Sequence, residues 1–465
     1  MKLCAFPMRF IKQYLPYYKN NLKIALPIVL TQLGGAVVSL ADNIMVGHVG
    51  TTELAAVSFS SSIYFLGHVL AIGAVMGITP LVGQVFVQKD KHNIKSYFYN
   101  GFLFSLIVAI ALTGLLFSVY PFLDKMGQET EVVETCRPYY LITTFSLIPF
   151  LLFCHFKQFM EGLGNTKIAM IITIIANCIN IVLNYLLIFG KWGFPKYGII
   201  GAGIATFIAR LLMPIMFIAI IRLKNQWWQY IKQFSIHLLS RQRLAKIAQI
   251  GVPIGGHMLL ECSVWCLSAI MVGWLGEVPL AANQIALQIA NTTFMIVIGI
   301  GNAATIRVSH RLGERKFKEL KMAANASTHL CILNNAITTI LIIAFSRQLP
   351  HIFTTDPTVI EAAIPLLILA GIFQIFDGIQ CIGIGILRGL TDVRIPVIYA
   401  FITYIVINLP LGYLLAFPLQ MGASGIWVAF SISLCMAAVL YHVRWRRKWN
   451  SLSKTYDQTS PLGIF

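Results

Sequence analysis

The sequence predicts an all-α polytopic membrane protein with twelve transmembrane helices in two six-helix bundles. Of its 465 residues, 57% are apolar and only 11% are charged, with a mean hydropathy of +0.77, a balance unlike that of soluble domains. Apolar runs of about 20 residues, the length that crosses a hydrocarbon core of about 30 Å, recur along the whole chain. The two halves of the chain also resemble each other.

Short polar or charged loops separate the apolar runs. Each run is long enough to cross a bilayer at a rise of about 1.5 Å per residue. In chain order the predicted spans are 24–46, 54–80, 98–120, 138–160, 167–189, 198–221, 246–273, 279–305, 325–346, 360–386, 395–417 and 422–443.

An internal repeat divides the chain. The stretch "IMVGHVGTTELAA" from residue 44 and "IMVGWLGEVPLAA" from residue 270 share eight of thirteen positions without a gap. The same offset of 226 residues pairs Pro27 with Pro253, Gly73 with Gly299 and Thr79 with Thr305. Glycine, proline and threonine in register are not explained by the similarity that any two apolar segments share, so the halves are duplicated.

The repeat gives four expected regions. They are an amino-terminal bundle (1–221), a basic linker (222–245), a carboxy-terminal bundle (246–445) and a tail (446–465). Since each half has six spans, both begin on the same side of the membrane and are expected to be related by a pseudo-two-fold axis along the membrane normal. Such repeats in transporters place a substrate cavity where the halves meet.

The basic residues predict the orientation. Most of the 35 lysines and arginines fall on the side of the amino terminus, including six in "IRLKNQWWQYIKQFSIHLLSRQRLAK", which contains no acid. Because cytoplasmic loops carry such an excess, both termini are predicted to be cytoplasmic, in the plasma (inner) membrane. The net charge of +18 lies at loop edges, which indicates contact with anionic lipid headgroups and not with nucleic acid.

Several chemistries are excluded by the motifs. There is no G-x-x-x-x-G-K-[ST] phosphate loop, no C-x-x-C pair among the nine cysteines and no long catalytic loop. The sequence therefore predicts neither an enzyme nor a tightly bound cofactor.

Three acids lie well inside predicted spans, away from the span ends: Asp42, Glu261 and Asp377. An ionised carboxylate near the bilayer centre costs about 2.5–3.5 kcal/mol, or roughly 8–10 kcal/mol for three, so such residues face a cavity or share a cation. The alternative is that each is neutral and helps to pack its bundle. Glu261 and Asp377, both central in spans of the second half, are expected to form one site that binds a proton or Na⁺.

Several motifs together resemble a known family. They are "LADNIMVGHVGTTELAAVS", "NCINIVLNYLLIFGKWGFPKYGIIGAGIAT", "LLECSVW", "AANQIALQI", "RVSHRLGERK" and "FQIFDGIQCIGIGILRGLTDVRIPV". In this order they are similar to the multidrug and toxic compound extrusion (MATE) transporters, in their NorM-like branch. The resemblance implies two bundles, open alternately to either side, that exchange an inward cation for an outgoing organic cation or drug. It also implies a cation site at Glu261 and Asp377 and a polar site at Asp42, Asn180 and Asn184.

One position departs from the NorM-like pattern. Phe373 stands one turn before Asp377, where that pattern often has a tyrosine, so a hydroxyl ligand for Na⁺ is missing. Other side chains are expected to line the cavity, with ordinary helix packing as the alternative for each: Gln284, Gln288, Phe373, His257 and Trp265.

Two prolines and one arginine stand out inside spans. Pro27 and Pro253 each remove a backbone hydrogen bond and are expected to act as hinges, although static kinks fit equally well. Arg210 either pairs with an embedded acid or extends to the interface, and the sequence does not choose between these.

The leading hypothesis is a monomeric secondary antiporter for lipophilic cations, coupled to Na⁺ or H⁺. A flippase or exporter for a lipid-linked or other amphiphilic substrate is the alternative from the same superfamily, and it would be expected to carry basic cavity residues. The embedded charge here is mainly acidic, which favours the antiporter.

Overall fold

The computed structural model describes residues 5–459, and regular structure in this range is helical. The described residues contain 12 helical segments long and apolar enough to cross a membrane. This confirms the predicted fold class. The segments are Lys12–Gly47, Thr51–Val87, Lys91–Lys125, Thr130–Gly162, Lys167–Phe189, Ile199–Leu223, Arg241–Gly273, Glu277–Gly313, Phe317–Ala344, Pro357–Gly389, Arg394–Ala416 and Gly422–Lys454.

The chain folds into two compact units. The amino-terminal unit is Leu30–Met258, and the carboxy-terminal unit joins Met1–Val29 to Leu259–Phe465. The boundaries fall inside helices α1 (Ala5–Gly47) and α10 (Arg241–Gly273) and not at the linker expected from the repeat. The division at the linker and the axis that relates the halves stay predictions of the repeat.

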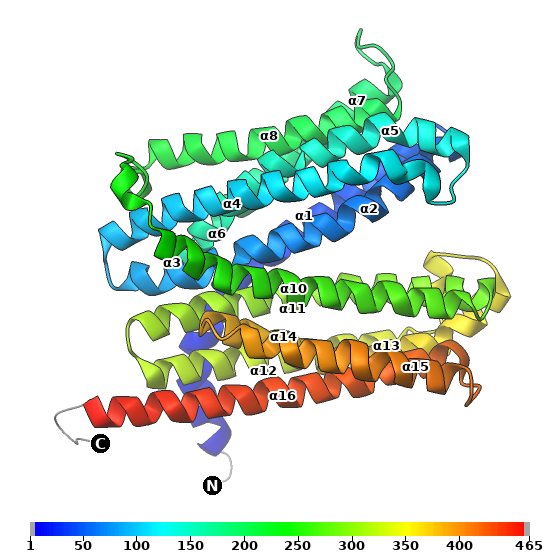
Figure 1. Ribbon diagram of the computed structural model, residues 1–465. Helices are drawn as coiled ribbons and strands as arrows, with labels where there is room; N and C mark the ends of the chain where they lie inside the picture. Colours follow the sequence, from blue (N-terminus) through cyan, green and yellow to red (C-terminus); the bar gives the residue numbers. More distant parts are fainter. Residues whose placement is uncertain (1–4, 460–465) are drawn as a thin grey trace. The chain divides into compact units, whose positions relative to one another are not determined.

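The amino-terminal unit holds the end of α1, the start of α10 and the elements between them (Figure 1). Within it α7 packs on α8, α2 on α5 and α4 on α6. These elements are α2 (Thr51–Met76), α3 (Ile78–Val87), α4 (Lys91–Val119), η1 (Tyr120–Lys125), α5 (Thr130–Phe145), α6 (Leu147–Gly162), α7 (Lys167–Phe189), α8 (Ile199–Leu223), α9 (Asn225–Trp228) and η2 (Ile236–Leu238).

The carboxy-terminal unit is built around α13, which packs against α11, α12 and α16. One segment departs from α-helix: η4 is a π-helix, a form found often at functional sites. The elements are α11 (Glu277–Gly313), α12 (Phe317–Ala344), η3 (Leu349–Ile352), α13 (Pro357–Gly389), α14 (Arg394–Ala400), η4 (Phe401–Asn408), α15 (Leu409–Ala416) and α16 (Gly422–Thr459).

Repeated glycines explain why the unit boundaries fall inside helices. A Cβ on Gly73 of α2 would come within 2.5 Å of the Cα of Gly255 in α10. At the matching position Gly299 of α11, a Cβ would come within 2.4 Å of a methyl of Val29 in α1. In each half the second span therefore packs directly on the amino-terminal part of the other half's first span and draws it into its own unit.

The two prolines lie close to these boundaries. Pro27 and Pro253 are internal to α1 and α10, and both helices continue through them. Each proline precedes the point where its helix passes from one unit to the other, which follows Val29 in α1 and Met258 in α10. Because proline lacks a backbone N–H, each helix loses a hydrogen bond near the point where it passes from one unit to the other. The hinge role of Pro27 and Pro253 stays a prediction, and this position supports it.

The loops α3–α4 and α11–α12 occupy repeated positions but are stabilised differently. Both contain a residue in the left-handed region, Lys89 and Arg315, each with φ of 58°. In the first loop the Asp90 carboxylate caps α4 by accepting a bond of 3.0 Å from the Asn93 amide, and this bond holds the pKa of Asp90 below its ordinary value.

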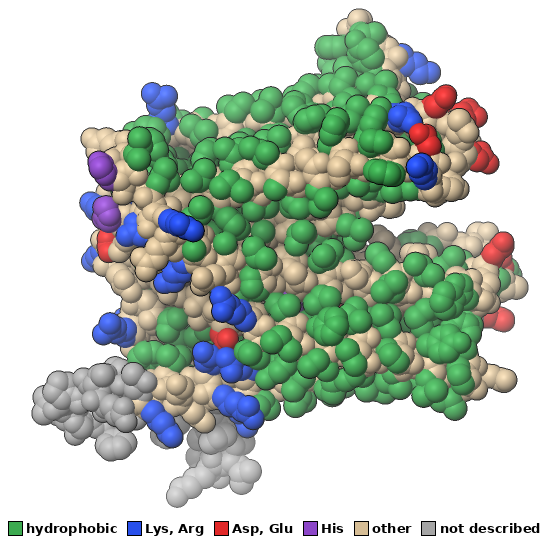
Figure 2. Space-filling model, in the orientation of Figure 1, with side chains coloured by type: hydrophobic (Ala, Val, Ile, Leu, Met, Phe, Trp, Pro, Cys, Tyr) green, Lys and Arg blue, Asp and Glu red, His purple; other side chains and the backbone are tan. Residues whose placement is uncertain are grey.

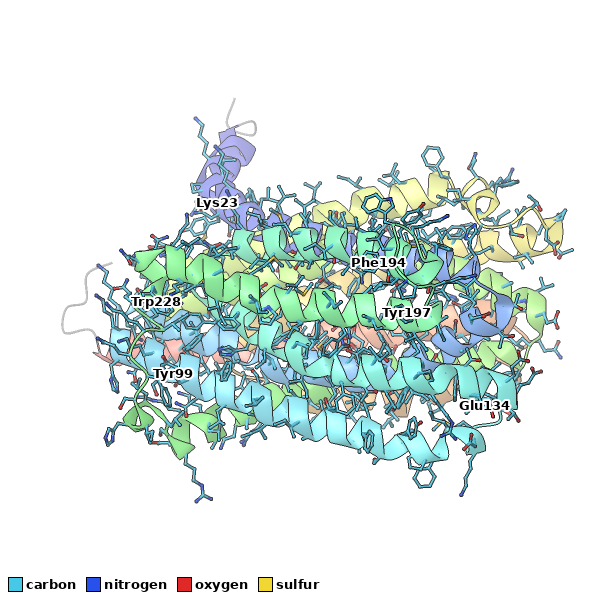
Figure 3. All side chains as sticks on the ribbon, turned by 90° about the horizontal axis from the view of Figure 1, so that it is seen from above. Lys23, Tyr99, Glu134, Phe194, Tyr197 and Trp228 are labelled. Carbon is cyan, nitrogen blue, oxygen red and sulfur yellow. The ribbon has the colours of Figure 1, made fainter. Side chains whose placement is uncertain are left out.

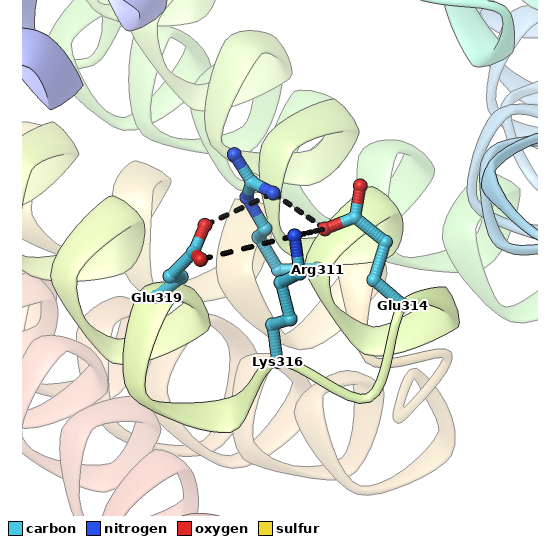
Figure 4. Close-up of polar contacts among 4 residues, drawn as sticks. All are labelled: Arg311, Glu314, Lys316 and Glu319. Carbon is cyan, nitrogen blue, oxygen red and sulfur yellow. Dashed lines mark hydrogen bonds and ion pairs between the residues drawn. The ribbon is translucent and has the colours of Figure 1, made fainter.

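Ion pairs stabilise the second loop (Figure 4). Arg311 pairs with Glu314 and, at 3.0 Å, with Glu319, and Lys316 lies 3.4 Å from Glu314. Partial burial raises the pKa of Glu314, but the hydrogen bond from Arg311 and the nearby charges outweigh it, and the net pKa is lowered.

Charge is distributed unevenly along each unit. Figure 2 shows hydrophobic side chains over the flanks of the helices, with charged side chains mainly near the helix ends. The exposed acids of the amino-terminal unit include Asp124, Glu129, Glu131 and Glu134, at the end of that unit away from its linker. This distribution is that of a multi-pass membrane protein.

Candidate functional site

Two acids come together in the carboxy-terminal unit. Glu261 lies on α10 and Asp377 on α13, and they are close enough for their charges to repel. Asp377 is 6% exposed, whereas Glu261 is partly buried. Because two ionised carboxylates close together in a buried place are costly, the pair Glu261 and Asp377 favours a bound proton or cation.

Aromatic rings form one wall beside the acids. Trp265 stacks on Phe430 with ring centroids 4.2 Å apart and meets Phe373 edge-on at 5.5 Å. Phe373 also meets Trp427 at 5.4 Å, and the Trp427 indole donates to Asn283 at 3.0 Å. Trp265 and Phe373 are therefore held within the packing of this unit, and no hydroxyl reaches Asp377 from residue 373.

A buried oxygen acceptor lies beside Asp377. Gln380, one turn on, is within hydrogen-bonding reach of the Asp377 carboxylate, and its own Oε1 accepts no hydrogen bond from the described residues. Carboxylate and amide oxygens are the ligands that hard cations take, so the donor set fits Na⁺ as well as a proton. Among the described residues, no group of three or more His, Cys, Asp or Glu is arranged to hold a metal.

Sequence reasoning missed two residues near the acids. Arg388, in the last turn of α13, lies close enough to attract Glu261, and its buried Nε donates to no described acceptor. Tyr404, 2% exposed on the π-helix η4, lies near both acids. Arg388 falls at the very end of its apolar run and Tyr404 is one of 17 tyrosines, so neither gave a signal in the sequence.

A close helix approach fixes the backbone beside Asp377. Asn335 of α12 donates to the Gln374 carbonyl at 2.6 Å. A Cβ on Gly378 would lie 1.9 Å from the Asn335 Nδ2 and 2.7 Å from the Cys331 sulfur, so only glycine permits this contact. The acid is thereby held on a rigid part of α13.

The amino-terminal unit contains a separate polar network. Asn184 donates to the Asp42 carboxylate and also to the Asn180 Oδ1 at 3.2 Å. Asn180 in turn donates to the Thr206 hydroxyl at 3.4 Å. The structure thus brings together the three residues predicted for this site.

Arg210 supplies a positive charge to that network. Its guanidinium donates to the Tyr64 hydroxyl and to the Ser146 hydroxyl, each at 2.6 Å, and lies 5.2 Å from the centre of the Phe150 ring. It is also near enough to attract Asp42. Of the two alternatives that the sequence left open, the structure favours a position inside the unit, where Arg210 bonds two hydroxyls and lies near Asp42.

The other predicted residues take different positions. Gln284 and Gln288 lie on an exposed face of α11, so they do not belong to the core of their own unit. His257 is buried, 1% exposed, one helical turn before Glu261 on α10. A further acid that the sequence placed in a loop, Glu161, is 3% exposed at the end of α6.

Comparison with known proteins identifies the family. The MatE family model matches residues 27–186 and again residues 253–414, so both halves of the repeat are copies of one family unit. The chain belongs to the MatE family. Each match begins at one of the two repeated prolines, Pro27 and Pro253.

Similar proteins cover nearly the whole MatE chain. Multidrug resistance protein NorM of Photobacterium profundum is 30% identical over 433 residues, 92% of this chain and 95% of that protein. The protein of the same name from Vibrio cholerae is 30% identical over 437 residues, with the same coverage.

Solved structures share the fold. The eukaryotic MATE transporter AtDTX14 matches with a TM-score of 0.84 at 20% identity, over 95% of this chain and 99% of that one. The bent form of the Vibrio cholerae MATE transporter VcmN matches with a TM-score of 0.85 at 17% identity, with the same coverage. At these identities the likeness concerns the fold.

Proposed function

We propose that this MatE protein is a secondary multidrug efflux antiporter that exports lipophilic cations in exchange for inward Na⁺ or H⁺. Membership of the family and the NorM relatives support transport of drugs. The observation that supports coupling is the pair of close acids, Glu261 and Asp377, with the unpartnered Gln380 oxygen beside them.

The mechanism follows from charge. With Arg388 nearby and one cation bound, the two acids are neutralised, and exposing them to lipid costs less. Without the cation, one negative charge is uncompensated and attracts another positive group. The inward ion and the outgoing cationic drug therefore alternate at these carboxylates, and occupancy by one opposes the other. Binding that favours one conformation shifts the equilibrium toward it, and bending at Pro27 and Pro253 would accompany the shift.

The site leaves the coupling ion open between two chemistries. Asp377, Glu261 and the Gln380 Oε1 would supply oxygen ligands to Na⁺, and the hydroxyl of Tyr404, which lies near both acids, would replace the one missing at Phe373. The same pair of carboxylates would hold a proton between them. Gln284 and Gln288, exposed on α11, are proposed to line the drug path.

We further propose that the protein acts as a monomer in the inner membrane, with both termini in the cytoplasm. The duplication supports a monomer because one chain supplies both bundles. The excess of bases near the predicted cytoplasmic loops supports the orientation.

Dye export from vesicles tests the proposal. Wild-type protein should expel ethidium when either a Na⁺ gradient or a pH gradient is imposed, and the effective gradient identifies the ion. Glu261→Gln protein of equal abundance should show no gradient-driven export. Undiminished export by that variant, or failure of both gradients with folded wild type, would refute antiport at this site.

A further inference from the structure

An apolar cavity lies inside the amino-terminal unit, away from both acid sites. It has a volume of about 410 Å³, within the range of about 300–1,000 Å³ typical of small-ligand sites. Its lining comes from α4, α6, α8 and the linker after α8. The side chains that line it include Phe98, Phe102, Phe156, Ile218, Trp228 and Phe234.

The linker is fixed over this cavity by hydrogen bonds to α4. The Ser96 hydroxyl donates to the Leu238 carbonyl at 2.5 Å, and Asn100 donates to the same carbonyl at 2.9 Å. The Tyr99 hydroxyl donates to the Ile231 carbonyl. Three successive contacts to one helix show that the cavity has a defined wall.

The cavity lies near the ends of two membrane-length helical segments. Tyr99 is eight residues from Lys91, the start of its membrane-length segment, or about 12 Å at 1.5 Å per residue. Ile218 is five residues from the end of its own segment at Leu223, or about 8 Å. Figure 3 labels Tyr99 and Trp228 at the same end of the amino-terminal unit, with Glu134 at the other.

A second hollow on the outer face of α8 adjoins the cavity. Ile218 lines both hollows, and Arg222 lines the outer one. The Arg222 guanidinium lies 5.8 Å from the centre of the Trp228 ring, which lines the inner cavity. The Arg222 cation therefore stands at the outer hollow and also beside a ring that lines the inner cavity.

The linker beside the cavity carries charge of one sign. Residues 222–246 contain six bases and no acid. Arg222, Lys224 and Lys232 are exposed, and so are the large apolar side chains of Leu223 (85%) and Ile236 (76%). Basic and aromatic residues combined with exposed apolar ones are typical of segments that lie at an anionic membrane surface.

We propose that this cavity binds an anionic phospholipid, with an acyl chain between α4, α8 and the linker and the phosphate at Arg222, Lys224 and Lys232. A lipophilic cation fits the apolar lining, but the basic rim repels it. A zwitterionic lipid offers the same chain without the net negative charge. The proposal concerns the linker and does not depend on the transport function.

Quenching of tryptophan by brominated lipids tests the proposal with full-length protein in phosphatidylcholine vesicles. The fluorescence quenching due to Trp228 is the quenching of the wild type minus that of Trp228→Phe, each measured relative to unbrominated lipid. Half of this Trp228 quenching should be reached with at least fivefold less brominated phosphatidylglycerol than brominated phosphatidylcholine. If both brominated lipids reach half-maximal quenching at the same concentration, or if Trp228 contributes no quenching, the proposal is overturned.

Charge variants separate a specific site from general attraction. Arg222→Gln/Lys224→Gln/Lys232→Gln should lose the fivefold preference. The matched variant Lys321→Gln/Arg446→Gln/Arg447→Gln, which removes three exposed bases from the other unit, should keep it. If the first variant does not fold, Lys232→Gln alone should lower the preference about twofold. If the control variant loses the preference for phosphatidylglycerol to the same extent, the proposal is contradicted.

Two competitors test the occupant. Neither inorganic phosphate nor ethidium should release the quenching of Trp228. Release by phosphate would indicate a simple anion site, and release by ethidium would indicate a drug site; either outcome would overturn the lipid assignment.

Discussion

The embedded acids of the two units differ in how their charge is compensated. In the amino-terminal unit the acid that lies well inside a predicted span, Asp42, has Arg210 near it, and the Asn184 side-chain amide donates to its carboxylate. In the carboxy-terminal unit two acids, Glu261 and Asp377, have one nearby arginine, Arg388. If all are ionised, the first group is neutral and the second has one negative charge in excess.

This difference favours the carboxy-terminal unit for ion coupling. An uncompensated charge in the membrane costs about 2.5–3.5 kcal/mol, which a monovalent cation removes when it binds. The carboxy-terminal group needs such a cation and the amino-terminal group does not. We therefore expect the inward ion and the cationic drug to alternate at the carboxy-terminal acids, and we expect the polar network at Asp42 to support export without binding the coupling ion.

The largest expected effect comes from removing an acid of the pair. Asp377→Asn should reduce gradient-driven ethidium export by more than about a hundredfold, because the remaining acid is then balanced by Arg388 and needs no cation. Asp42→Asn should reduce export less, by about tenfold, and retain its dependence on the ion. Rates are compared in vesicles with equal amounts of protein. Equal loss of ion dependence in both variants would break the comparison.

Removing the charge of Arg388 should have the opposite effect and strengthen binding of the coupling ion. Arg388→Gln leaves two acids without an internal base, so the coupling ion should bind about tenfold more tightly and leave more slowly. The half-saturating ion concentration for export measures this. Arg388→Lys, which keeps the charge, should stay within about twofold of wild type. A weaker apparent affinity in Arg388→Gln would count against charge compensation.

The rigid backbone at Asp377 predicts a stability effect. Gly378→Ala forces a Cβ to within 1.9 Å of the Asn335 amide, so it should cost about 1–3 kcal/mol and lower the thermal midpoint. Gly114→Ala, on α4 with nothing within 4 Å of the new Cβ, should be neutral or stabilise by up to about 1 kcal/mol. Similar midpoints for both variants would show that α12 and α13 can separate without cost.

The smallest effects concern the repeated loops. Asp90→Ala removes the cap of α4 and should cost about 0.5 kcal/mol, because the group is partly exposed. Since the folded pKa of Asp90 is depressed, its contribution is present above the unfolded value of about 3.9 and is lost as pH falls through the folded pKa. Thermal unfolding at decreasing pH measures this.

The ion-paired loop of the other half gives the contrast. Glu314→Gln should also cost about 0.5 kcal/mol, but this cost should shrink as salt is added, since exposed ion pairs are screened. A salt-independent cost there, or an equal salt effect at Asp90→Ala, would show that the loops do not differ as described.

The fold could be predicted from the sequence because duplication and hydropathy specify it. Gly73 with Gly299 and Thr79 with Thr305 share an offset of 226 residues, and each pair makes matching contacts: Thr79 donates to the Gln158 carbonyl and Thr305 to the Gly385 carbonyl. The passage of α1 and α10 between units could not be predicted, since it depends on which helices the glycines meet.

The site was only partly predictable because it breaks the repeat. At the same offset, the positions of Glu261 and Asp377 correspond to Gly35 and Leu151, so the acids have no counterpart in the first half. Acids in apolar runs are conspicuous, which is why Asp42, Glu261 and Asp377 were found. Arg388 and Tyr404 are brought near them by tertiary packing, which hydropathy does not report.

Direct measurement of bound ions tests the difference between the units. Radiolabelled Na⁺ binding, or proton release on addition of ethidium, is measured on purified wild-type, Asp377→Asn and Asp42→Asn proteins in detergent. We predict about one cation per chain in wild type and Asp42→Asn, and none in Asp377→Asn. Full occupancy in Asp377→Asn together with loss in Asp42→Asn would place the coupling ion in the amino-terminal unit and contradict the account.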